Sequence, residues 1–374
     1  MNYVMLKDVC AINMGQSPDS KSYNDTGDGV PFFQGNADFG ARYPVTRKWC
    51  SEPTKMAAPN DILISVRAPI GAMNYARENC CIGRGLAALT PDKSKALPEF
   101  IFWLLKGKNA ELNSKGTGST FKAISRKVLE EIMIPEISLE KQIEFSEILE
   151  RVYGVIQARK EELQKLDELI KARFVELFGD PRSNPFGFEK KMLKDTCKVI
   201  TGNTPSRAIA EYYGDYIEWI KTDNIVSGIL NPTQATESLS EKGMNVGRTV
   251  EKDSILMACI AGSIASIGRV CITDRIVAFN QQINAVVPEQ YNILFLYVLL
   301  QMSKDYLVED INMALKGILS KSKLEEKEFI IPPMDLQEQF SDFVKQVNKS
   351  KVKVQKALDE TQKLFDSLMQ QYFG

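Results

Sequence analysis

The stretch KQIEFSEILERVYGVIQARKEELQKLDELIKARFVELF, residues 141–178, decides how the rest of this chain is organised. Its apolar residues return every seven positions, and one register contains Leu149, Ile156, Leu163 and Ile170. A helix of this length would extend for about 57 Å at 1.5 Å per residue, which is more than one globular domain needs to cover its core. The seven-residue period is typical of a coiled coil, so we expect one long helix that pairs with another.

The partner helix is expected at the end of the same chain. A second stripe with the same period runs to the C-terminus and includes Val347, Val354, Leu358 and Phe365. Both stripes end in the dipeptide Phe-Gly, at 178–179 and 373–374. Two stripes in register at a fixed offset predict a tandem duplication in which each repeat closes with a long helix.

A few core positions of these stripes are polar. They are Arg159 and Arg173 in the first stripe, and Lys351 and Thr361 in the second. Polar residues at such positions can fix the register and orientation of a coiled coil at some cost in stability.

Shorter motifs also occur twice and in the same order. A Gly-x-[Ser/Thr]-Pro turn appears at 15–18 and again at 202–205. Short strands are expected at 30–33 and 61–65, with counterparts at 217–220 and 254–258, and a short helix at 100–105 has its counterpart at 295–300. The segment 179–187 is rich in Gly, Pro and Asn and marks the boundary between the repeats.

The predicted fold class is α+β, with two similar globular domains that alternate with two long helices paired as an antiparallel coiled coil. The globular domains are expected at 1–138 and 179–335, and the helices at 139–178 and 336–374.

Composition limits the chemistry that the chain can perform. It has 374 residues, enough for two or three domains, and a formal net charge of −1. There is no histidine, and the seven cysteines include no Cys-x-x-Cys pair, so a Cys/His zinc site and any step that needs imidazole are excluded and no metal site is predicted. The sequence has no signal peptide and no apolar run long enough for a membrane span, so we expect a soluble, cytoplasmic protein with no membrane partner.

The order of these pieces resembles the specificity subunit of type I restriction-modification systems. The resemblance rests on the Gly-x-[Ser/Thr]-Pro turns, on the Ile-Pro then Leu-x-x-Gln entries to both long helices, and on Leu-Phe-Gly-Asp-Pro at 177–181. Each motif is short, but their order occurs twice and covers essentially the whole chain.

This resemblance implies a non-catalytic subunit that reads a bipartite, asymmetric site in double-stranded DNA. In the family, each globular part is a target-recognition domain for one half-site, and the coiled coil spaces the two readers. The implied partners are two methyltransferase subunits, to which restriction subunits with nuclease and translocase activity can be added. S-adenosylmethionine on the partner supplies the methyl group, which adenine is expected to receive, so no cofactor is expected on this chain.

If the domains read DNA, base readers and phosphate contacts should form separate sets. Arg suits guanine, and Asn or Gln suits adenine, with other polar residues in support. The base-reading candidates are Gln16, Ser20, Lys21, Tyr23, Gln34, Asn36, Arg67 and Arg84 in the first repeat, and Asn203, Arg207, Tyr213, Lys221, Asp223, Asn224, Gln281 and Gln282 in the second. The phosphate candidates lie in and beside basic, glycine-rich loops and are Lys115, Lys122, Arg126, Lys316 and Lys321.

Two motifs could suggest that the chain is itself an enzyme. The Asn-Pro-Phe at 184–186 lacks the second proline of an amino-methyltransferase motif and lies in the junction, where a turn explains it better. Asp180 with Glu189 and Lys191 could suggest a nuclease, but no strand pattern flanks these residues. We therefore expect neither activity in this chain.

Two other interpretations of the architecture stay open at the level of sequence. One is the equivalent subunit of a related type II-like modification system, whose partner chain combines methylase and nuclease. The other is a coiled-coil scaffold whose globular domains bind protein or carbohydrate. Binding that falls steeply with salt but prefers one split sequence would favour DNA recognition, and indifference to DNA would favour the scaffold.

Overall fold

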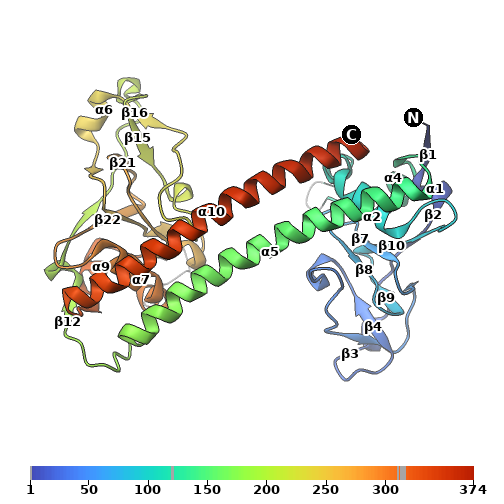
Figure 1. Ribbon diagram of the computed structural model, residues 1–374, viewed down its shortest axis with the longest axis horizontal. Helices are drawn as coiled ribbons and strands as arrows, with labels where there is room; N and C mark the ends of the chain where they lie inside the picture. The colour runs from blue at the N-terminus through green and yellow to red at the C-terminus, as the bar shows by residue number, and fades with distance from the viewer. Residues whose placement is uncertain (1, 119–121, 310, 312–316) are drawn as a thin grey trace. The chain divides into compact units, whose positions relative to one another are not determined.

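The computed structural model describes residues 2–118, 122–309, 311 and 317–374. Its contacts divide the chain into two compact units: unit 1 comprises Met1–Lys160 with Lys356–Gly374, and unit 2 comprises Glu161–Gln355. Each unit contains one globular domain and part of both long helices (Figure 1).

The globular part of unit 1 is built mainly on two sheets. An antiparallel four-stranded sheet has the order β2 (Cys10–Met14), β10 (Leu86–Pro91), β7 (Ile62–Ser65) and β8 (Met73–Tyr75). A five-stranded sheet has the order β3 (Tyr23–Asn24), β5 (Trp49–Cys50), β4 (Val30–Phe33), β9 (Cys80–Ile82) and β6 (Met56–Ala57). A further pair joins β1 (Tyr3–Met5) to β11 (Met133–Pro135). Only β4 and β9 pair in parallel among the strands described in this unit.

Unit 2 repeats these sheets with the same strand orders and adds one further strand pair. Its four-stranded sheet has the order β13 (Cys197–Thr201), β22 (Ile283–Pro288), β18 (Ile255–Ala258) and β20 (Val270–Ile272). Its five-stranded sheet has the order β14 (Tyr213–Gly214), β16 (Ser238–Leu239), β15 (Ile217–Ile220), β21 (Val277–Phe279) and β17 (Thr249–Val250), again with one parallel pair, β15 with β21. Two small pairs join β12 (Lys190–Met192) to β24 (Glu328–Ile330), and β19 (Ile260–Ala261) to β23 (Gly317–Ile318). The shared strand order confirms the predicted tandem repeat.

Short helices complete each domain. Unit 1 has α1 (Leu6–Val9), α2 (Pro98–Gly107), α3 (Asn109–Ser114) and α4 (Arg126–Glu130), with 3-10 turns η1 (Ser20–Ser22) and η2 (Asn36–Asp38). Unit 2 has α6 (Glu241–Val246), α7 (Ile293–Met302), α8 (Lys304–Val308) and α9 (Lys321–Glu326), with η3 (Leu193–Asp195), η4 (Ala210–Tyr212), η5 (Thr222–Asn224) and η6 (Ile264–Ser266). Helices α2 and α7 contain the short helices that the sequence predicted, and their apolar residues lie in the two main cores.

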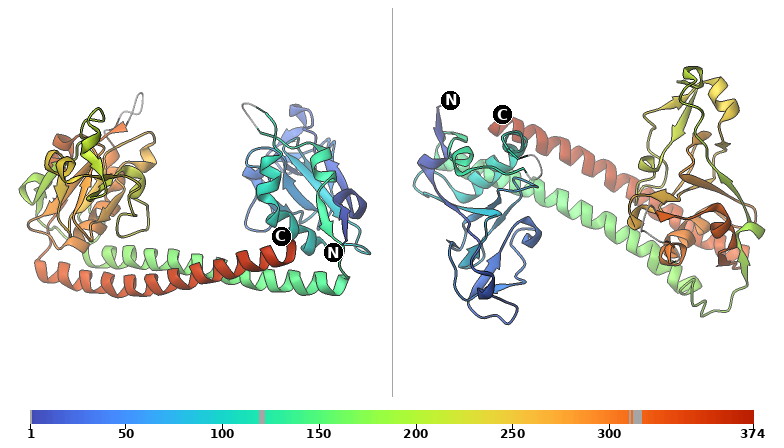
Figure 2. Two further views of the ribbon diagram at one scale, coloured as in Figure 1. Left: turned by 90° about the horizontal axis from the view of Figure 1, so that it is seen from above. Right: turned by 180° about the vertical axis from the view of Figure 1, so that it is seen from behind.

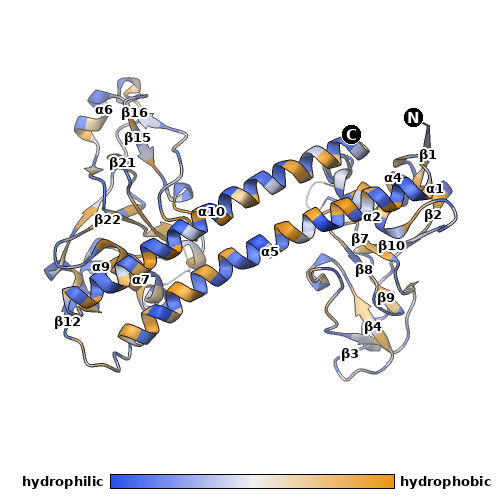
Figure 3. Cartoon of the chain, viewed as in Figure 1, coloured by the Kyte–Doolittle hydropathy of each residue, from blue (hydrophilic) through white to orange (hydrophobic). Residues whose placement is uncertain are grey.

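The long helices α5 (Leu139–Phe178) and α10 (Met334–Phe373) are 40 residues each. Apolar and polar residues alternate along both in the pattern of a coiled coil (Figure 3). The core positions Leu149, Ile156, Ile170, Val347, Leu358 and Phe365 are buried, while Leu163 and Val354 are half-buried.

Contacts within each unit show that the two helices run in opposite directions. In unit 1 the ring of Phe145 stacks on Tyr372 with centroids 3.9 Å apart, and Tyr153 packs on Phe365 at 6.0 Å. In unit 2 the ring of Phe174 lies 5.6 Å from that of Phe340, and Lys351 Nζ lies 2.6 Å from Asp167 Oδ1. The helices lie side by side within each unit in every view (Figure 2). The polar core residue Lys351 therefore has an acidic partner on the facing helix.

A buried glutamine fixes the start of each long helix. Gln142 Oε1 accepts a hydrogen bond from Leu97 N at 2.9 Å, and Gln337 Oε1 accepts one from Asn292 N at the same distance. Both bonds tie the long helix to the start of the short core helix, α2 or α7. In the Leu-x-x-Gln entry of the second repeat, at 336–339, the final glutamine, Gln339, is exposed. Gln337, two residues earlier, takes the place that Gln142 has in the first repeat, and α10 begins at Met334.

Among the described residues, no helix is both long enough and apolar enough to cross a lipid bilayer.

Candidate nucleic-acid interface

In unit 1, backbone hydrogen bonds hold four segments side by side that are far apart in the sequence. Gln16 N, in the first Gly-x-Ser-Pro turn, donates to Ile82 O over 3.0 Å. Val66 N donates to Gly85 O over 2.9 Å, and Ile124 N donates to Val66 O over the same distance. The turn, the start of β10, the end of β7 and the basic loop before α4 therefore form one continuous row.

Unit 2 contains the equivalent row. Asn203 N donates to Phe279 O over 3.1 Å. Cys259 N donates to Gln282 O, and Leu319 N donates to Cys259 O, both over 2.8 Å. We name these sets the recognition rows: residues 15–18, 66–67, 82–86 and 122–124 in unit 1, and 202–205, 259–260, 279–283 and 317–319 in unit 2. Each row brings base-reading candidates together with the loop that carries the phosphate candidates.

The first glycine of each turn allows two backbone segments to touch. A Cβ atom on Gly15 would lie 2.1 Å from Gly83 O, and a Cβ atom on Gly202 would lie 2.2 Å from Asn280 O. Any other residue would have to push these carbonyl groups away. The glycine of the motif is therefore required by close backbone packing, and this packing fixes the position of the next residue of the turn.

Two tyrosines that were base-reading candidates brace these turns. Tyr23 Oη donates to Pro18 O over 3.0 Å, and Tyr213 Oη donates to Pro205 O over 2.6 Å. Each is half-buried. The structure thus uses both hydroxyl groups inside the protein, where they fix the proline of the motif.

Arg207 and Lys221 of unit 2 converge on one carboxylate, that of Glu237. Arg207 Nη2 lies 2.6 Å from Glu237 Oε2, and Lys221 Nζ forms an ion pair with Glu237 Oε1. The guanidinium carbon of Arg207 also lies 4.4 Å from the ring centroid of Tyr213 and 5.1 Å from that of Trp219. Arg207 is held by these groups while its side chain stays 55% exposed. An exposed and oriented guanidinium is well suited to paired hydrogen bonds with a guanine edge.

Glu237 and Trp219 are the residues of this cluster that the sequence analysis missed. Hydrogen bonds from Lys221 and Arg207 hold the pKa of Glu237 below its usual range, so its carboxylate is ionised at neutral pH. Trp219 is almost fully buried, and its Nε1 donates to Asn203 O over 3.3 Å. Trp219 could have been found from its place in the strand expected at 217–220, but nothing in the sequence marks Glu237.

The exposed candidates of unit 1 gather around its recognition row. Gln16, Gln34 and Arg84 are all exposed. Arg84 N lies 3.4 Å from Ser17 Oγ, and a Cβ atom on Gly85 would lie 2.3 Å from Gln34 O, so these three segments are in close contact. The other candidates near η1 and η2 are the exposed Ser20 and Lys21 and the half-buried Asn36.

Three phosphate candidates are paired with a glutamate one helical turn away. The pairs are Lys115 with Glu111 at 2.6 Å, Arg126 with Glu130 at 2.7 Å, and Lys321 with Glu325 at 3.5 Å. Exposed pairs of this kind contribute only about 0–1 kcal/mol, so a DNA phosphate could replace the glutamate at little cost.

The other phosphate candidates lie in the two basic loops. Lys122 is exposed and neighbours Arg67, because Ala68 N donates to Lys122 O over 3.1 Å. Lys316 lies outside the residues that the structure describes.

Asn224 is turned inward, which differs from the exposed position that base reading requires. It is 8% exposed, its Oδ1 accepts from Lys221 N at 2.9 Å and its Nδ2 donates to Gln234 O at 3.1 Å. Its amide therefore shapes the loop that carries Lys221. Of its neighbours in the prediction, Asp223 and Gln281 are exposed and Gln282 is half-buried.

The junction residues that could have suggested an enzyme act as turn residues. Asp180 Oδ1 accepts from Ser183 N at 2.8 Å and from Arg182 N at 3.1 Å, and these backbone donors lower the pKa of Asp180. Asn184 exchanges two hydrogen bonds with the backbone of Phe188. Both side chains are occupied in forming the link between α5 and β12.

Comparison with known proteins agrees with this arrangement. Residues 1–168 and 185–361 match the family described as type I restriction modification DNA specificity domain. The chain is 42% identical over 157 residues to a putative type I restriction enzyme MjaX specificity subunit of Methanocaldococcus jannaschii, a stretch that covers 42% of this chain and 37% of that relative. It is 25% identical over 401 aligned positions to the type I restriction enzyme MjaIX specificity subunit of the same organism, which covers 97% of this chain and 90% of the relative.

Two solved structures have a similar fold over the whole chain. The type I restriction-modification S subunit of M. genitalium has a TM-score of 0.61 at 14% sequence identity, and the match covers 100% of this chain and 96% of that one. A chain from a study of complex assembly and conformational transition in a type I system has a TM-score of 0.56 at 17% identity, covering 100% and 97%. Because the family match takes in both repeats and most of the sequence, the chain belongs to the type I restriction-modification DNA specificity family.

Proposed function

We propose that this chain reads a split, asymmetric sequence in double-stranded DNA for a type I restriction-modification complex. One observation carries the proposal: the two recognition rows and the turns beside them share a backbone framework but differ in side chains at equivalent points. Gln34 of unit 1 stands where unit 2 has Lys221. Arg84 of unit 1 stands where unit 2 has Gln281. Readers with different donors and acceptors on the same framework select different bases, so the two half-sites should differ.

Unit 2 has the most sharply defined base reader. Arg207, oriented by Glu237 and Tyr213, would donate to O6 and N7 of a guanine in the major groove. Such a bidentate contact discriminates against other bases by about 1–3 kcal/mol. Gln281, which is exposed beside the same turn, suits an adenine.

The recognition domains would be residues 1–138 and 179–335, and the paired helices α5 and α10 would set the gap between the half-sites. A 40-residue helix is about 60 Å long, and pairing with a second helix stiffens it. A stiff spacer would make the unread gap a constant of the recognition sequence.

The chain would direct the chemistry of its partners without performing it. Its sequence contains no histidine, and all seven cysteines are buried, which leaves no imidazole base and no accessible thiol nucleophile. The two relatives from M. jannaschii carry the names of specificity subunits of type I restriction enzymes. By that likeness, the partners would be two methyltransferase subunits, with restriction subunits joining them.

Co-expression with the methyltransferase encoded beside this chain, followed by mapping of modified bases across the host genome, tests the proposal. The expected result is one motif of two unlike halves around a fixed gap, methylated on both strands and unmodified when this chain is omitted. Unchanged methylation in the presence of a soluble, active partner would contradict it.

A further inference from the structure

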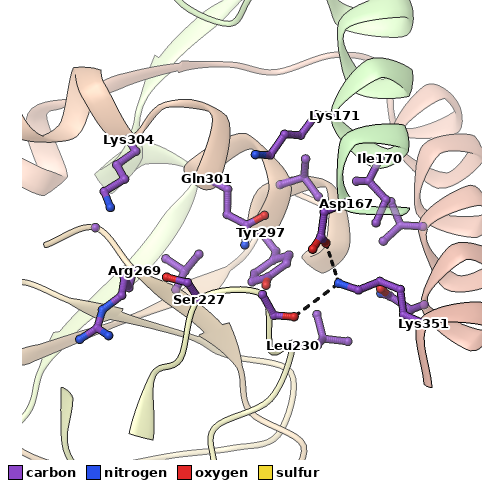
Figure 4. Close-up of a pocket in the computed structure, with 16 residues that line it drawn as sticks. Asp167, Ile170, Lys171, Ser227, Leu230, Arg269, Tyr297, Gln301, Lys304 and Lys351 are labelled. Carbon is purple, nitrogen blue, oxygen red and sulfur yellow. Dashed lines mark hydrogen bonds and ion pairs between the residues drawn. The ribbon is translucent and has the colours of Figure 1, made fainter. Parts of the chain in front are cut away.

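A cavity of about 260 Å³ lies inside unit 2, and no residue of the recognition row lines it. Its walls come from α5, α7, α10, the first residue of α8, the start of β20 with the two residues before it, and the loop that ends at Leu230 (Figure 4). Five charged side chains line it: Asp167, Lys171, Arg269, Lys304 and Lys351. Four of the five are cations, although the chain as a whole has a formal net charge of −1.

One of the four cations is already neutralised. Lys351 Nζ lies 2.6 Å from Asp167 Oδ1 and 3.4 Å from Gly228 O, as the dashed lines in Figure 4 indicate. This pair belongs to the contact between the two long helices. It leaves Lys171, Arg269 and Lys304 as the source of the cavity's positive charge.

Neutral carbonyl groups hold two of these three cations in position. Arg269 Nη2 donates to Thr222 O over 3.1 Å, and its Nε donates to Ser266 O over 3.2 Å. Lys304 Nζ donates to Ala265 O. Within the described part of the chain, none of Lys171, Arg269 and Lys304 forms an ion pair with an acidic residue. A carbonyl orients a cation without cancelling its charge, so these groups are arranged for an external anion.

The uncharged part of the cavity wall strengthens the attraction of these cations for an anion. Ile170, Leu230, Val270 and Val298 supply apolar surface, which lowers the local dielectric and makes the attraction for an anion stronger than in open solvent. Gln301 adds a further hydrogen-bond donor from α7. The side chains of Lys171 and Gln301 stand on neighbouring elements at one side of the cavity in Figure 4.

We propose that this cavity binds a phosphate group of the DNA backbone outside the bases that unit 2 reads. Arg269 links this cavity to the base-reading candidates of unit 2. Its Nη2 donates to the carbonyl of Thr222, which opens η5 and directly follows the base-reading candidate Lys221. DNA presents a continuous line of phosphates beyond any half-site, so a reader bound at Lys221 brings further phosphates within its neighbourhood. The inference rests on the proposed function, since it takes DNA as the ligand of the same unit.

The test measures DNA binding by the complex of the full chain with its methyltransferase partner at several salt concentrations. The probes are one duplex with the motif found by methylation mapping and one of equal length with that motif scrambled. The variant is K171Q/K304Q, and the control is Lys165→Gln, which removes an exposed cation from α5 that does not line the cavity. Each lost phosphate contact should reduce the magnitude of the slope of log K against log salt by about 0.9, so the double variant, which removes the one contact proposed here, should lose about 0.9 of slope on both duplexes.

The outcomes separate this inference from the function on which it rests. An equal loss of affinity on both duplexes, with assembly of the complex intact and the control unaffected, supports the phosphate site. Wild-type slope and affinity in the double variant would overturn it. Failure of the complex to assemble would also overturn it, because the cavity would then receive an acidic segment of the partner. Saturable binding of inorganic phosphate that depends on Lys171 and Lys304, together with an unchanged DNA slope, would assign the cavity to free phosphate instead. If the wild-type complex does not prefer the motif duplex, the proposed function itself fails, whatever the variants do.

Discussion

Glu237 places a negative charge in the middle of a surface that is proposed to meet DNA. This charge repels DNA phosphates, but its ion pairs with Arg207 and Lys221 hold both cations in a fixed position. The same carboxylate also limits how strongly this surface attracts DNA without regard to sequence. We therefore expect Glu237 to act as a positioning residue that lowers the general affinity for DNA and raises the selectivity for one sequence.

Replacing Glu237 with Gln should weaken selectivity without weakening general binding. In E237Q the preference for the motif duplex over the scrambled one should fall by about tenfold, because Arg207 loses its orienting partner, while binding to the scrambled duplex stays equal or rises. Glu211→Gln is the matched control, since Glu211 pairs with Lys242 in the same unit and is exposed. Equal losses on both duplexes would mean that Glu237 has only a structural role.

The pH dependence of this cluster follows from the direction of the shift. The pKa of Glu237 is lower in the folded chain than in the unfolded chain, where it is near 4.5. The contribution of Glu237 to the stability of the fold is therefore complete above pH 4.5 and is lost as the pH falls through the pKa of the folded chain. Between pH 6 and 8 the carboxylate stays ionised in both states. Selectivity that changes across this range in the wild type but not in E237Q would contradict the assignment.

Buried thiols should make the folded chain less stable in alkali. Burial raises the pKa of Cys197 and Cys271 from 9.0 to about 12, so their stabilising contribution is complete below about pH 9 and is lost as the pH rises towards 12. Lys106 of unit 1 has the opposite effect on stability. Burial lowers its pKa from 10.5 to about 8, so the stability of the fold gains from its deprotonation as the pH rises between these two values.

Urea unfolding at pH 8 and pH 10, followed by circular dichroism, checks this expectation. The wild type should lose stability between the two pH values, and Cys271→Ala should lose less, because one titrating thiol has been removed. A wild-type chain that is equally stable at both pH values, or a C271A variant with a larger loss, would show that the thiols do not set the alkaline limit.

At the scale of elements, the features that the sequence predicted correctly are those with a repeated pattern. The heptads predicted the two 40-residue helices α5 and α10, and the apolar runs at 30–33 and 217–220 predicted the equivalent strands β4 and β15. The two-residue strands, such as β5 and β16, are too short to carry a period, so the five-stranded sheets could not be foreseen.

The burial of Gln337 at the start of α10 could not be predicted for a similar reason. Two glutamines lie close together at 337 and 339, and a sequence motif cannot tell which of them is buried. The hydrogen bond that Gln337 makes to Asn292 N decides the matter, and that partner is distant in sequence. Asn224 was misplaced for the same reason, since its partners Thr233 and Gln234 lie on the next loop.

Two glycines of unit 1 should respond in opposite directions to alanine. Gly154 lies within α5 with nothing near its missing Cβ, so Gly154→Ala should raise the free energy of unfolding by about 0.5–1 kcal/mol. Gly15→Ala should lower it by about 1–3 kcal/mol, because its Cβ would meet the carbonyls of 82, 83 and 86. Urea titration of the two variants provides the measurement, and changes of the same sign would contradict this account of the turn.

At the scale of the whole molecule, the duplication separates framework from recognition. The strands, the core helices and the glycine turns are common to both units, whereas the exposed side chains along the recognition rows differ. Each row can therefore vary without disturbing the core of its own domain or the other row. This independence predicts that the loss of a base-reading candidate from one unit changes one half-site alone.

The most direct test is methylation mapping with two single variants, Arg84→Ala in unit 1 and Arg207→Ala in unit 2. Both side chains are exposed, so the folded chain and its complex should be retained. We expect each variant to relax or change a different half of the motif, with the other half and the gap as in the wild type. Changes in the same half, or in both halves at once, would contradict the account of two independent readers.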